Sequence, residues 1–418
     1  MLPENSRTRT GHSERREALA DPSRRIAQKS QNHVCEIFEF RCAPLKMTFV
    51  GLNAKFLVLA AALLLVTACD RPAVHSETTP QSQQSAEQIQ IPEHGAYTGA
   101  YIDFGETEDH VTLEGIENFE AMVGKHQAIV ASSSYWGEQT FPTENVNLIA
   151  RHGSIPLLFW SPWDKPYDEN NGPDRYSLAA ILDGKFDAYI DQWGESARQF
   201  GHPLFVSFCN EMNGTWFPWS GCFYGGNQIL PGDGPKKFAG PEFFKKAYRY
   251  VVDRVRAKGA RNILWVFHVM NYSYPQDTWN YAAQYYPGPD YVDWIGLSVY
   301  GQQDSNDPWA NFLPLLEWPY EEIRRLDSTK PLMLAEWGIG EFPKLGDKSH
   351  FISDFFNLIP TKFPNIKAAV FWHERWLNED DSYSNLRVNS SQEALDAYRK
   401  GVASPYWLDY PRYQPLKK

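Results

Sequence analysis

Several motifs that would assign a function directly are missing from this chain of 418 residues. It has no glycine-rich phosphate loop, no dinucleotide-binding fingerprint and no histidine or cysteine residues at metal-ligand spacing. A long basic run is also missing, and the net charge is -11 from 40 basic and 51 acidic residues. We therefore expect no nucleic-acid partner, no cofactor and no metal site.

Cysteine is scarce, with five in the whole chain. Cys35 and Cys42 lie in an N-terminal leader and Cys69 ends a short apolar segment, which leaves Cys209 and Cys222 in the folded part. In an oxidising compartment these last two could form a disulfide that braces the loop between them. The alternative is two separate cysteines, with Cys209 packed inside.

The N-terminal region lacks the apolar periodicity of a folded domain. Residues 1–46 are polar and rich in arginine, so we expect an untranslated or disordered leader, with Met47 as the initiator. Residues 47–68 combine one positive charge with an apolar core at 56–66, which predicts a signal peptide. A transmembrane anchor is the alternative, but the apolar run is too short to span a bilayer comfortably.

The residues that follow the apolar core indicate how the chain is attached. Leu65–Cys69 resembles the lipobox of bacterial lipoproteins, in which the cysteine is lipidated and becomes the mature N-terminus. Residues 69–94 contain mainly Ser, Thr, Gln, Pro and Glu, which predicts a flexible tether. We expect a protein of the bacterial cell envelope, anchored by lipid at Cys69 and facing the periplasm, or held at the outer membrane or cell surface.

Residues 95–418 carry the hydrophobic material for one large domain, since 43% of the chain is hydrophobic and 15% aromatic. Apolar strand patterns alternate with helical patterns, such as those at 113–123, 186–200 and 242–258. This alternation predicts a single (β/α)₈ TIM barrel of the α/β class, with its active site at the C-terminal strand ends. The expected strands are 96–104, 128–135, 155–160, the strand leading to residue 211, 263–269, 292–300, 332–337 and 366–372.

Two of these strands end in a glutamate. Phe205–Trp219 passes from an apolar run to Asn210 and Glu211, and Pro331–Gly340 passes through an apolar run to Glu336. An isolated buried charge is costly, so a carboxylate at a strand end indicates a polar site. Strands four and seven lie opposite each other across an eight-stranded ring. Two carboxyl groups brought together in this way are what glycoside hydrolysis requires, one as acid and base and one as nucleophile.

The residues around the two glutamates resemble a known family. Asn-Glu-Met-Asn-Gly-Thr-Trp-Phe-Pro-Trp at 210–219 and Ala-Glu-Trp-Gly at 335–338 are similar to motifs of glycoside hydrolase family 26, the β-mannanase and lichenase group. The resemblance runs from about residue 95 to 398. It implies that Glu211 is the acid/base and Glu336 the nucleophile, with retention of configuration.

The resemblance also suggests residues that bind the substrate. It implies that Tyr300 hydrogen-bonds the nucleophile, although its hydroxyl could be satisfied elsewhere, and that Trp372 lies under the sugar at the cleavage point. His268 could face the cleft or be a hydrogen-bonded core residue, and Glu374 is expected to pair with an arginine such as Arg375. Further expected contacts with the polysaccharide are Asn210, Trp136, Trp163, Trp216 and Trp219, with Trp160 as another platform candidate and about half of these tryptophans expected in the core.

One departure from the family pattern affects the expected substrate. Many β-mannanases of the family have histidine directly before the acid/base and arginine further back on the strand, where this chain has Asn210 and Ser207. The two-glutamate chemistry does not depend on these two residues. Asparagine at 210, however, suits a sugar with an equatorial 2-hydroxyl, such as glucose or xylose, as well as it suits mannose.

We expect a monomeric retaining endo-β-glycanase with β-mannan as its first expected substrate. Mixed-linkage β-1,3-1,4-glucan, β-1,3-xylan or an exopolysaccharide are alternatives within the family. A non-catalytic polysaccharide-binding lipoprotein is the alternative from another functional class, and an unrelated barrel enzyme is a third.

Overall fold

The computed structural model describes residues 87–418 except 106, 165–172, 174, 379–381 and 416–418. The predicted leader, signal peptide, lipidated Cys69 and most of the predicted tether lie outside these residues. Within the described part, no helix is long and apolar enough to cross a membrane.

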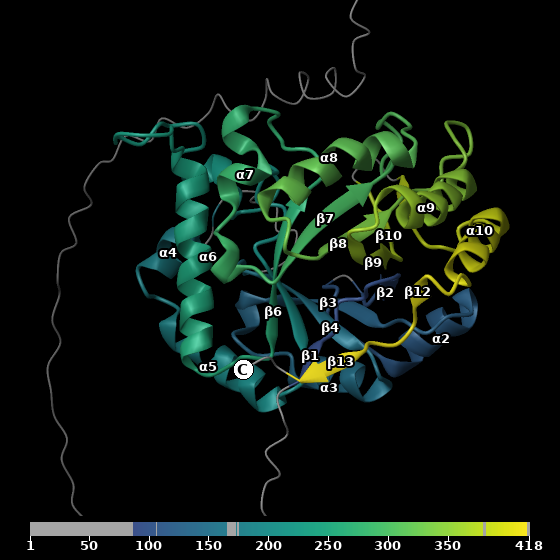
Figure 1. The fold of residues 1–418 in the computed structure, drawn as a ribbon, viewed down its shortest axis with the longest axis horizontal. Coiled ribbons are helices and arrows are strands. Elements are labelled where there is room, and N and C mark those ends of the chain that lie inside the picture. Colours follow the sequence, from purple (N-terminus) through teal and green to yellow (C-terminus); the bar gives the residue numbers. More distant parts are fainter. Residues whose placement is uncertain (1–86, 106, 165–172, 174, 379–381, 416–418) are drawn as a thin grey trace, which may run out of the picture.

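Eight parallel strands close into a barrel (Figure 1). Each strand pairs with the next along the chain, and the first, β2, also pairs with the last, β9. The predicted (β/α)₈ fold is therefore confirmed. The barrel strands are β2 (Ala96–Tyr101), β3 (Ile129–Tyr135), β4 (Ile155–Ser161), β5 (Leu204–Phe208), β6 (Ile263–Met270), β7 (Trp294–Tyr300), β8 (Leu332–Gly338) and β9 (Ile366–Trp372).

The strands are buried on both sides because helices cover the barrel. Their residues are near-continuous apolar runs, such as Ile-Leu-Trp-Val-Phe in β6, rather than alternating ones. The helices are α2 (Leu113–Val123), α3 (Thr143–His152), α4 (Leu178–Leu182), α5 (Asp187–Phe200), α6 (Ala239–Ala257), α7 (Ala282–Tyr285), α8 (Phe312–Leu326), α9 (Lys348–Lys362) and α10 (Gln392–Val402).

Three of these helices end at a glycine shortly before the next barrel strand begins. Gly124, Gly153 and Gly201 follow α2, α3 and α5 with φ of 72°, 96° and 70°. Glycine adopts this left-handed conformation without the steric cost that a Cβ atom brings. Each helix therefore stops close to the start of the next barrel strand.

Short elements outside the barrel were not predicted. β1 (Glu87–Ile89) pairs antiparallel with β13 (Tyr413–Pro415), and Gln90 N–H donates to the Arg412 carbonyl at 2.8 Å. The predicted flexible tether, 69–94, is therefore wrong for its last residues, because 87–94 belong to the folded domain. The other short strands are β10 (Arg375–Leu377), β11 (Tyr383–Asn385) and β12 (Trp407–Leu408), of which β12 extends the sheet beside β2.

No disulfide joins the two cysteines of the described part. Cys209 is fully buried directly after β5, and Cys222 is partly buried in the 3₁₀ turn η2 (Gly221–Tyr224). The structure thus has the arrangement of two separate cysteines rather than the disulfide.

Candidate active site

The chain turns sharply at the end of β5. Cys209 and Glu211 both have a φ of 54°, a left-handed conformation that is uncommon for residues other than glycine. Two hydrogen bonds hold this turn: Glu211 N–H donates to the His268 carbonyl at 2.9 Å, and Trp219 Nε1–H donates to the Asn210 carbonyl at 2.6 Å. Strained backbone of this kind concentrates at functional sites because surrounding contacts must maintain it.

Glu336 comes from β8, on the other side of the barrel. The pairing of β7 with β8 shifts register between Leu297 and Ser298, which places Ser298 opposite Glu336. Tyr300, at the end of β7, donates its hydroxyl hydrogen to Glu336 Oε2 at 2.8 Å. The geometry predicted for Tyr300, a hydrogen bond to the second glutamate, is therefore present.

The structure brings the two glutamates together. A carboxylate oxygen of Glu211, one of Glu336 and a ring nitrogen of His268 all lie within 4.8 Å of one another. The side chains are nearly buried, since Glu211 is 6% and Glu336 7% exposed. Retaining glycosidases hold their carboxyl groups about 5–5.5 Å apart, whereas inverting enzymes leave about 6.5–9.5 Å for a water molecule. This close approach fits the retaining arrangement.

Burial raises the pKa of both glutamates, because removing a carboxylate from water disfavours its charged form. The charge of Glu211 raises the pKa of Glu336 further, while the hydrogen bond from Tyr300 partly offsets this. Hydrogen bonds from Ser298 and from Trp216, whose Nε1 lies 2.8 Å from Glu211 Oε2, partly offset the effect of burial on Glu211. Two such neighbours resist ionising together, so the pair retains one proton over a range of pH.

His268 lies next to the two glutamates and forms hydrogen bonds with two serines. Its Nδ1 lies 3.0 Å from Ser207 Oγ, and its Nε2 lies 2.8 Å from Ser298 Oγ and 4.0 Å from Glu336 Oε1. Burial lowers the pKa of His268 to about 3, so the ring is neutral. Because Ser298 also donates to the Glu211 carboxylate, Nε2–H donates to Ser298 and Nδ1 accepts from Ser207.

This network favours the second of the two alternatives for His268, a hydrogen-bonded core residue, over a residue that faces the cleft and binds substrate. The side chain is completely buried and all its hydrogen-bonding capacity is used within the protein. It is the hydrogen-bonded core histidine that was the alternative. Ser207, at the position where many family members have arginine, supplies one of its two partners.

Three of the predicted tryptophans keep some exposure around the site. Trp216 is half-buried and hydrogen-bonds Glu211, and Trp163 is 8% exposed. Trp372, at the end of β9 and 7% exposed, stacks on Tyr101 with ring centroids 4.1 Å apart. Asn210 lies directly before Glu211 and is 6% exposed.

Trp136 and Trp219 are core residues, so their predicted contact with substrate is wrong. Trp136 is fully buried and packs 5.3 Å from Trp160, itself fully buried. Trp219 is 1% exposed, stacks on Phe217 at 4.6 Å and uses its ring nitrogen to hold the turn before Glu211. An aromatic residue at a strand end can turn towards the helices as readily as towards the barrel axis, and sequence does not distinguish the two.

Two further carboxyl groups surround the glutamate pair. Glu374 Oε2 accepts from Trp372 Nε1 at 2.6 Å rather than pairing with Arg375, whose guanidinium lies 3.7 Å from the Tyr383 ring centroid. Burial, then the charge of Glu108, raises the pKa of Glu374 to about 8. The sequence did not single out Glu108, because it is one of several acidic residues in one loop. In the structure Glu108 has a φ of 56° and accepts a hydrogen bond from Ser133 Oγ at 2.7 Å.

Among the described residues, two groups have the donor atoms for a metal ion. One is Glu211, His268 and Glu336. The other is Glu120, His126 and His152, far from the glutamate pair in the chain, where Glu120 lies 2.9 Å from His126 and 3.0 Å from His152. In both groups hydrogen bonds within the protein already engage the carboxylates, and neither group needs an ion to explain its geometry.

A (β/α)₈ barrel with two buried glutamates at the ends of its fourth and seventh strands has the arrangement that glycoside hydrolysis requires. The family model of glycosyl hydrolase family 26 matches residues 174–318, which contain Glu211 and Tyr300. Over these residues the chain is therefore similar to family 26.

Individual proteins of this kind are similar to the chain. Endoglucanase H of Acetivibrio thermocellus is 27% identical over 293 residues, which are 69% of this chain and 29% of that protein. A mannan endo-1,4-beta-mannosidase of Bacillus subtilis is 31% identical over 198 residues, 47% of this chain and 45% of that protein. The chain therefore spans less than half the length of either relative. The structure of a Bacillus subtilis mannanase has a TM-score of 0.52 at 18% identity over 76% of this chain and 88% of the other, which supports the fold.

Replacing Tyr300 by phenylalanine should lower kcat about 10- to 100-fold, or ~1.4–2.7 kcal/mol. The change removes only the hydroxyl that donates to Glu336. Because that hydrogen bond lowers the pKa of Glu336, its loss raises this pKa and moves the acidic limb of the pH–rate profile to higher pH. The matched control is Tyr97→Phe, since Tyr97 donates to the Gln90 carbonyl away from the glutamates. Equal losses in both variants, with no shift of the acidic limb, would rule out a specific role for Tyr300.

Proposed function

We propose that the chain is a retaining endo-β-glycanase that hydrolyses β-linked polysaccharide, with β-mannan as the leading substrate. The observation that carries this proposal is the close approach of the Glu211 and Glu336 carboxyl groups at the ends of opposite barrel strands. The family 26 match over residues 174–318 supports the same reaction class.

The first step is displacement at the anomeric carbon. The Glu336 carboxylate attacks this carbon and forms an ester bond to the sugar while the glycosidic C–O bond breaks. Protonated Glu211 gives its proton to the leaving oxygen. Tyr300 fixes the orientation of Glu336, and burial keeps a proton available on the pair.

The second step returns the enzyme to its starting state. The Glu211 carboxylate takes a proton from water, whose oxygen attacks the anomeric carbon and releases the Glu336 carboxylate. Two inversions give net retention. Trp216 Nε1–H stabilises the negative charge on Glu211 between the two steps.

β-Glucan is a second candidate substrate. Asn210 stands where many β-mannanases have histidine, and the similarity to an endoglucanase extends over 69% of this chain. β-1,3-Xylan and exopolysaccharide are the other candidates within the family.

Product analysis with the full chain tests the activity and chooses among these substrates. The protein is incubated with β-mannan, lichenan, β-1,3-xylan and curdlan, and the products are sized over time. We expect internal cleavage, seen as an early fall in polymer length, and a β-anomer as the first product by proton NMR. Binding without any cleavage would favour the non-catalytic polysaccharide-binding protein, and an α-anomer would contradict retention.

The pH dependence of kcat/KM should be bell-shaped, with both limbs above the ordinary glutamate pKa of about 4.3. Activity requires one proton on the pair: lowering the pH protonates Glu336, and raising the pH removes the proton from Glu211. Burial raises the pKa of both groups, so both limbs move up. In Glu211→Ala, assayed on a substrate with a good leaving group, the alkaline limb should disappear. Its persistence would assign that limb to another group, such as Glu374.

We also propose that the enzyme is a monomer held at the bacterial cell envelope by lipid on Cys69. The support is the signal-peptide pattern at 47–68 and the lipobox-like sequence that ends at Cys69. Metabolic labelling with a radioactive fatty acid tests this, and label retained in Cys69→Ser would contradict attachment at this residue.

A further inference from the structure

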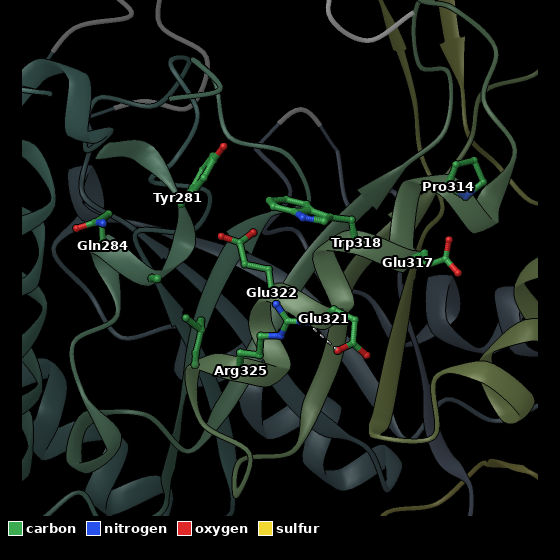
Figure 2. A pocket seen from close by; sticks show the side chains of 10 residues that line it. Tyr281, Gln284, Pro314, Glu317, Trp318, Glu321, Glu322 and Arg325 are labelled. Atoms are coloured by element: carbon green, nitrogen blue, oxygen red, sulfur yellow. Dashed lines mark ion pairs between the residues drawn. The ribbon is translucent and has the colours of Figure 1, made fainter. Parts of the chain in front are cut away.

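A groove of about 760 Å³ lies between α7 and α8, and neither Glu211 nor Glu336 lines it (Figure 2). Its lining includes Tyr281, Gln284, Trp318, Glu321, Glu322 and Arg325. The apolar face of α8 is buried against the barrel and contains Leu316, Tyr320 and Ile323. Trp318 lies on the same helix but is 48% exposed. A large aromatic ring that lines a groove together with polar groups marks a candidate binding surface.

The ring of Trp318 is held in place by two tyrosines. Tyr272 lies parallel to it, with an interplanar angle of 1° and centroids 6.3 Å apart, and its hydroxyl donates to the Pro314 carbonyl at 2.8 Å. Tyr281 meets Trp318 at 67° with centroids 6.0 Å apart. Such rings supply rigid apolar area at low entropic cost. The flat face of Trp318 suits the C–H face of a pyranose ring.

Polar groups with planar ends surround this ring. Gln284 and Arg325 offer N–H donors, while Glu317, Glu321 and Glu322 offer carboxyl oxygens. Glu321 pairs with Arg324 at 2.9 Å and with Arg325 at 3.9 Å, so charges of both signs are present. In Figure 2 the Glu322 side chain points towards the part of the groove that Trp318 and Tyr281 line. The lining has three carboxyl groups and one guanidinium, so it is acidic, and its donors, acceptors and apolar face together fit a hydroxyl-rich ligand without negative charge.

One segment of chain connects this groove to the glutamate pair. Residues 271–281 follow β6, and within them Tyr272 stacks on Trp318. The ring centroid of Tyr274 lies 5.7 Å from that of Trp216, which donates a hydrogen bond to Glu211. Asn213, two residues beyond Glu211, anchors the segment: its carbonyl accepts from Tyr274 N–H at 2.8 Å and from Asn280 Nδ2–H at 2.8 Å. The two sites thus share a rigid border.

We propose that the Trp318 groove is a second glycan-binding site, which holds a distal stretch of the β-linked polysaccharide whose bonds are cleaved at the glutamate pair. This inference rests on the proposed function for the choice of ligand. A long chain bound at both places gains effective concentration at the catalytic site. A short oligosaccharide, which reaches only the catalytic site, gains nothing.

Affinity electrophoresis with the full chain tests the groove independently of catalysis. Glu336→Ala, which does not degrade the ligand, is run in native gels that contain soluble galactomannan or lichenan. Adding Trp318→Ala should weaken the apparent affinity about tenfold, because large aromatic anchors dominate binding. Trp318→Phe should recover part of the retardation. The matched control is Tyr410→Ala, which removes a ring that is 56% exposed and lies outside the groove.

Kinetics of the otherwise unmodified enzyme provide the second measurement. Trp318→Ala should raise KM on the polysaccharide and leave kcat/KM on a short chromogenic oligosaccharide unchanged. Retardation equal to that of the Tyr410→Ala control would overturn the proposal, as would an equal loss on long and short substrates. If no polysaccharide is cleaved by the wild type but retardation still depends on Trp318, the proposed activity fails while the groove remains a glycan site.

Discussion

Glu336→Ala is expected to lower the hydrolysis of a polysaccharide substrate by about 10⁴-fold or more, or at least ~5.5 kcal/mol of transition-state stabilisation. The change removes the proposed nucleophile, which would form the covalent bond to the sugar, and the loss should appear in kcat. The measurement is the initial rate of reducing-end release, with Glu336→Gln as a near-isosteric second variant. Thermal melts of both variants show whether the fold survives.

The products formed with azide identify the chemical role of Glu336. Alanine leaves space beside the anomeric carbon, so azide can attack from the vacated side while Glu211 still protonates the leaving group. A single displacement gives a glycosyl azide of inverted configuration. Glu108→Gln is the control, since Glu108 is a buried carboxyl group of the same site without an assigned covalent role. Rescue by azide in the control, or a product of retained configuration from Glu336→Ala, would contradict the assignment.

The barrel could be predicted because its elements carry strong local patterns. β9 and β6, for example, are mainly apolar segments with one polar residue each, Lys367 and His268, and each lies within one residue of its predicted bounds. β1 and β13 could not be found in this way, because each has three residues and their pairing joins opposite ends of the domain. So few side chains give no periodicity, and only the folded chain brings such strands together.

The sequence located the two glutamates, and the family resemblance predicted the contact of Tyr300 with Glu336, but most of the other contacts around the pair could not be predicted. Glu211 and Glu336 stand out because a carboxylate interrupts an apolar run, which is costly without a site. The direction of a side chain is a weaker signal: Trp216 reaches Glu211, whereas Trp219, three residues later, is buried. Glu374 shows the same limit, since its partner is Trp372 two residues back rather than the adjacent Arg375.

The chain of hydrogen bonds through His268 depends on three strands at once. Ser207 is on β5, His268 on β6 and Ser298 on β7, and a register shift next to Ser298 sets its position. Serine and histidine are common in strands for many reasons, so nothing in the sequence links these three. Because the lowered pKa of His268 leaves its ring neutral, the ring brings no positive charge to Glu211. The hydrogen bond of the ring to Ser298 instead holds a hydroxyl donor next to the Glu211 carboxylate.

Glu211→Ala should give a different result from Glu336→Ala, because the two steps depend on Glu211 unequally. With the natural polysaccharide, the first step loses its proton donor and the rate should fall about 10³-fold or more, or ~4 kcal/mol. An aryl glycoside with a good leaving group needs little protonation, so its first step should stay close to the wild-type rate. The glycosyl-enzyme should then accumulate, since no base activates water, and a burst of aryl product should precede slow turnover.

Azide completes the distinction between the two glutamates. In Glu211→Ala it needs no base, so it should attack the glycosyl-enzyme directly, restore turnover of the aryl glycoside and give a glycosyl azide of retained configuration after two displacements. The anomeric configuration of the azide, read by proton NMR, therefore separates the roles. Retention from Glu336→Ala together with inversion from Glu211→Ala would mean that the roles are reversed. Near wild-type hydrolysis of the polysaccharide by both variants would mean that the catalytic pair lies elsewhere, because two displacements at one anomeric carbon cannot proceed without a nucleophile and a proton donor.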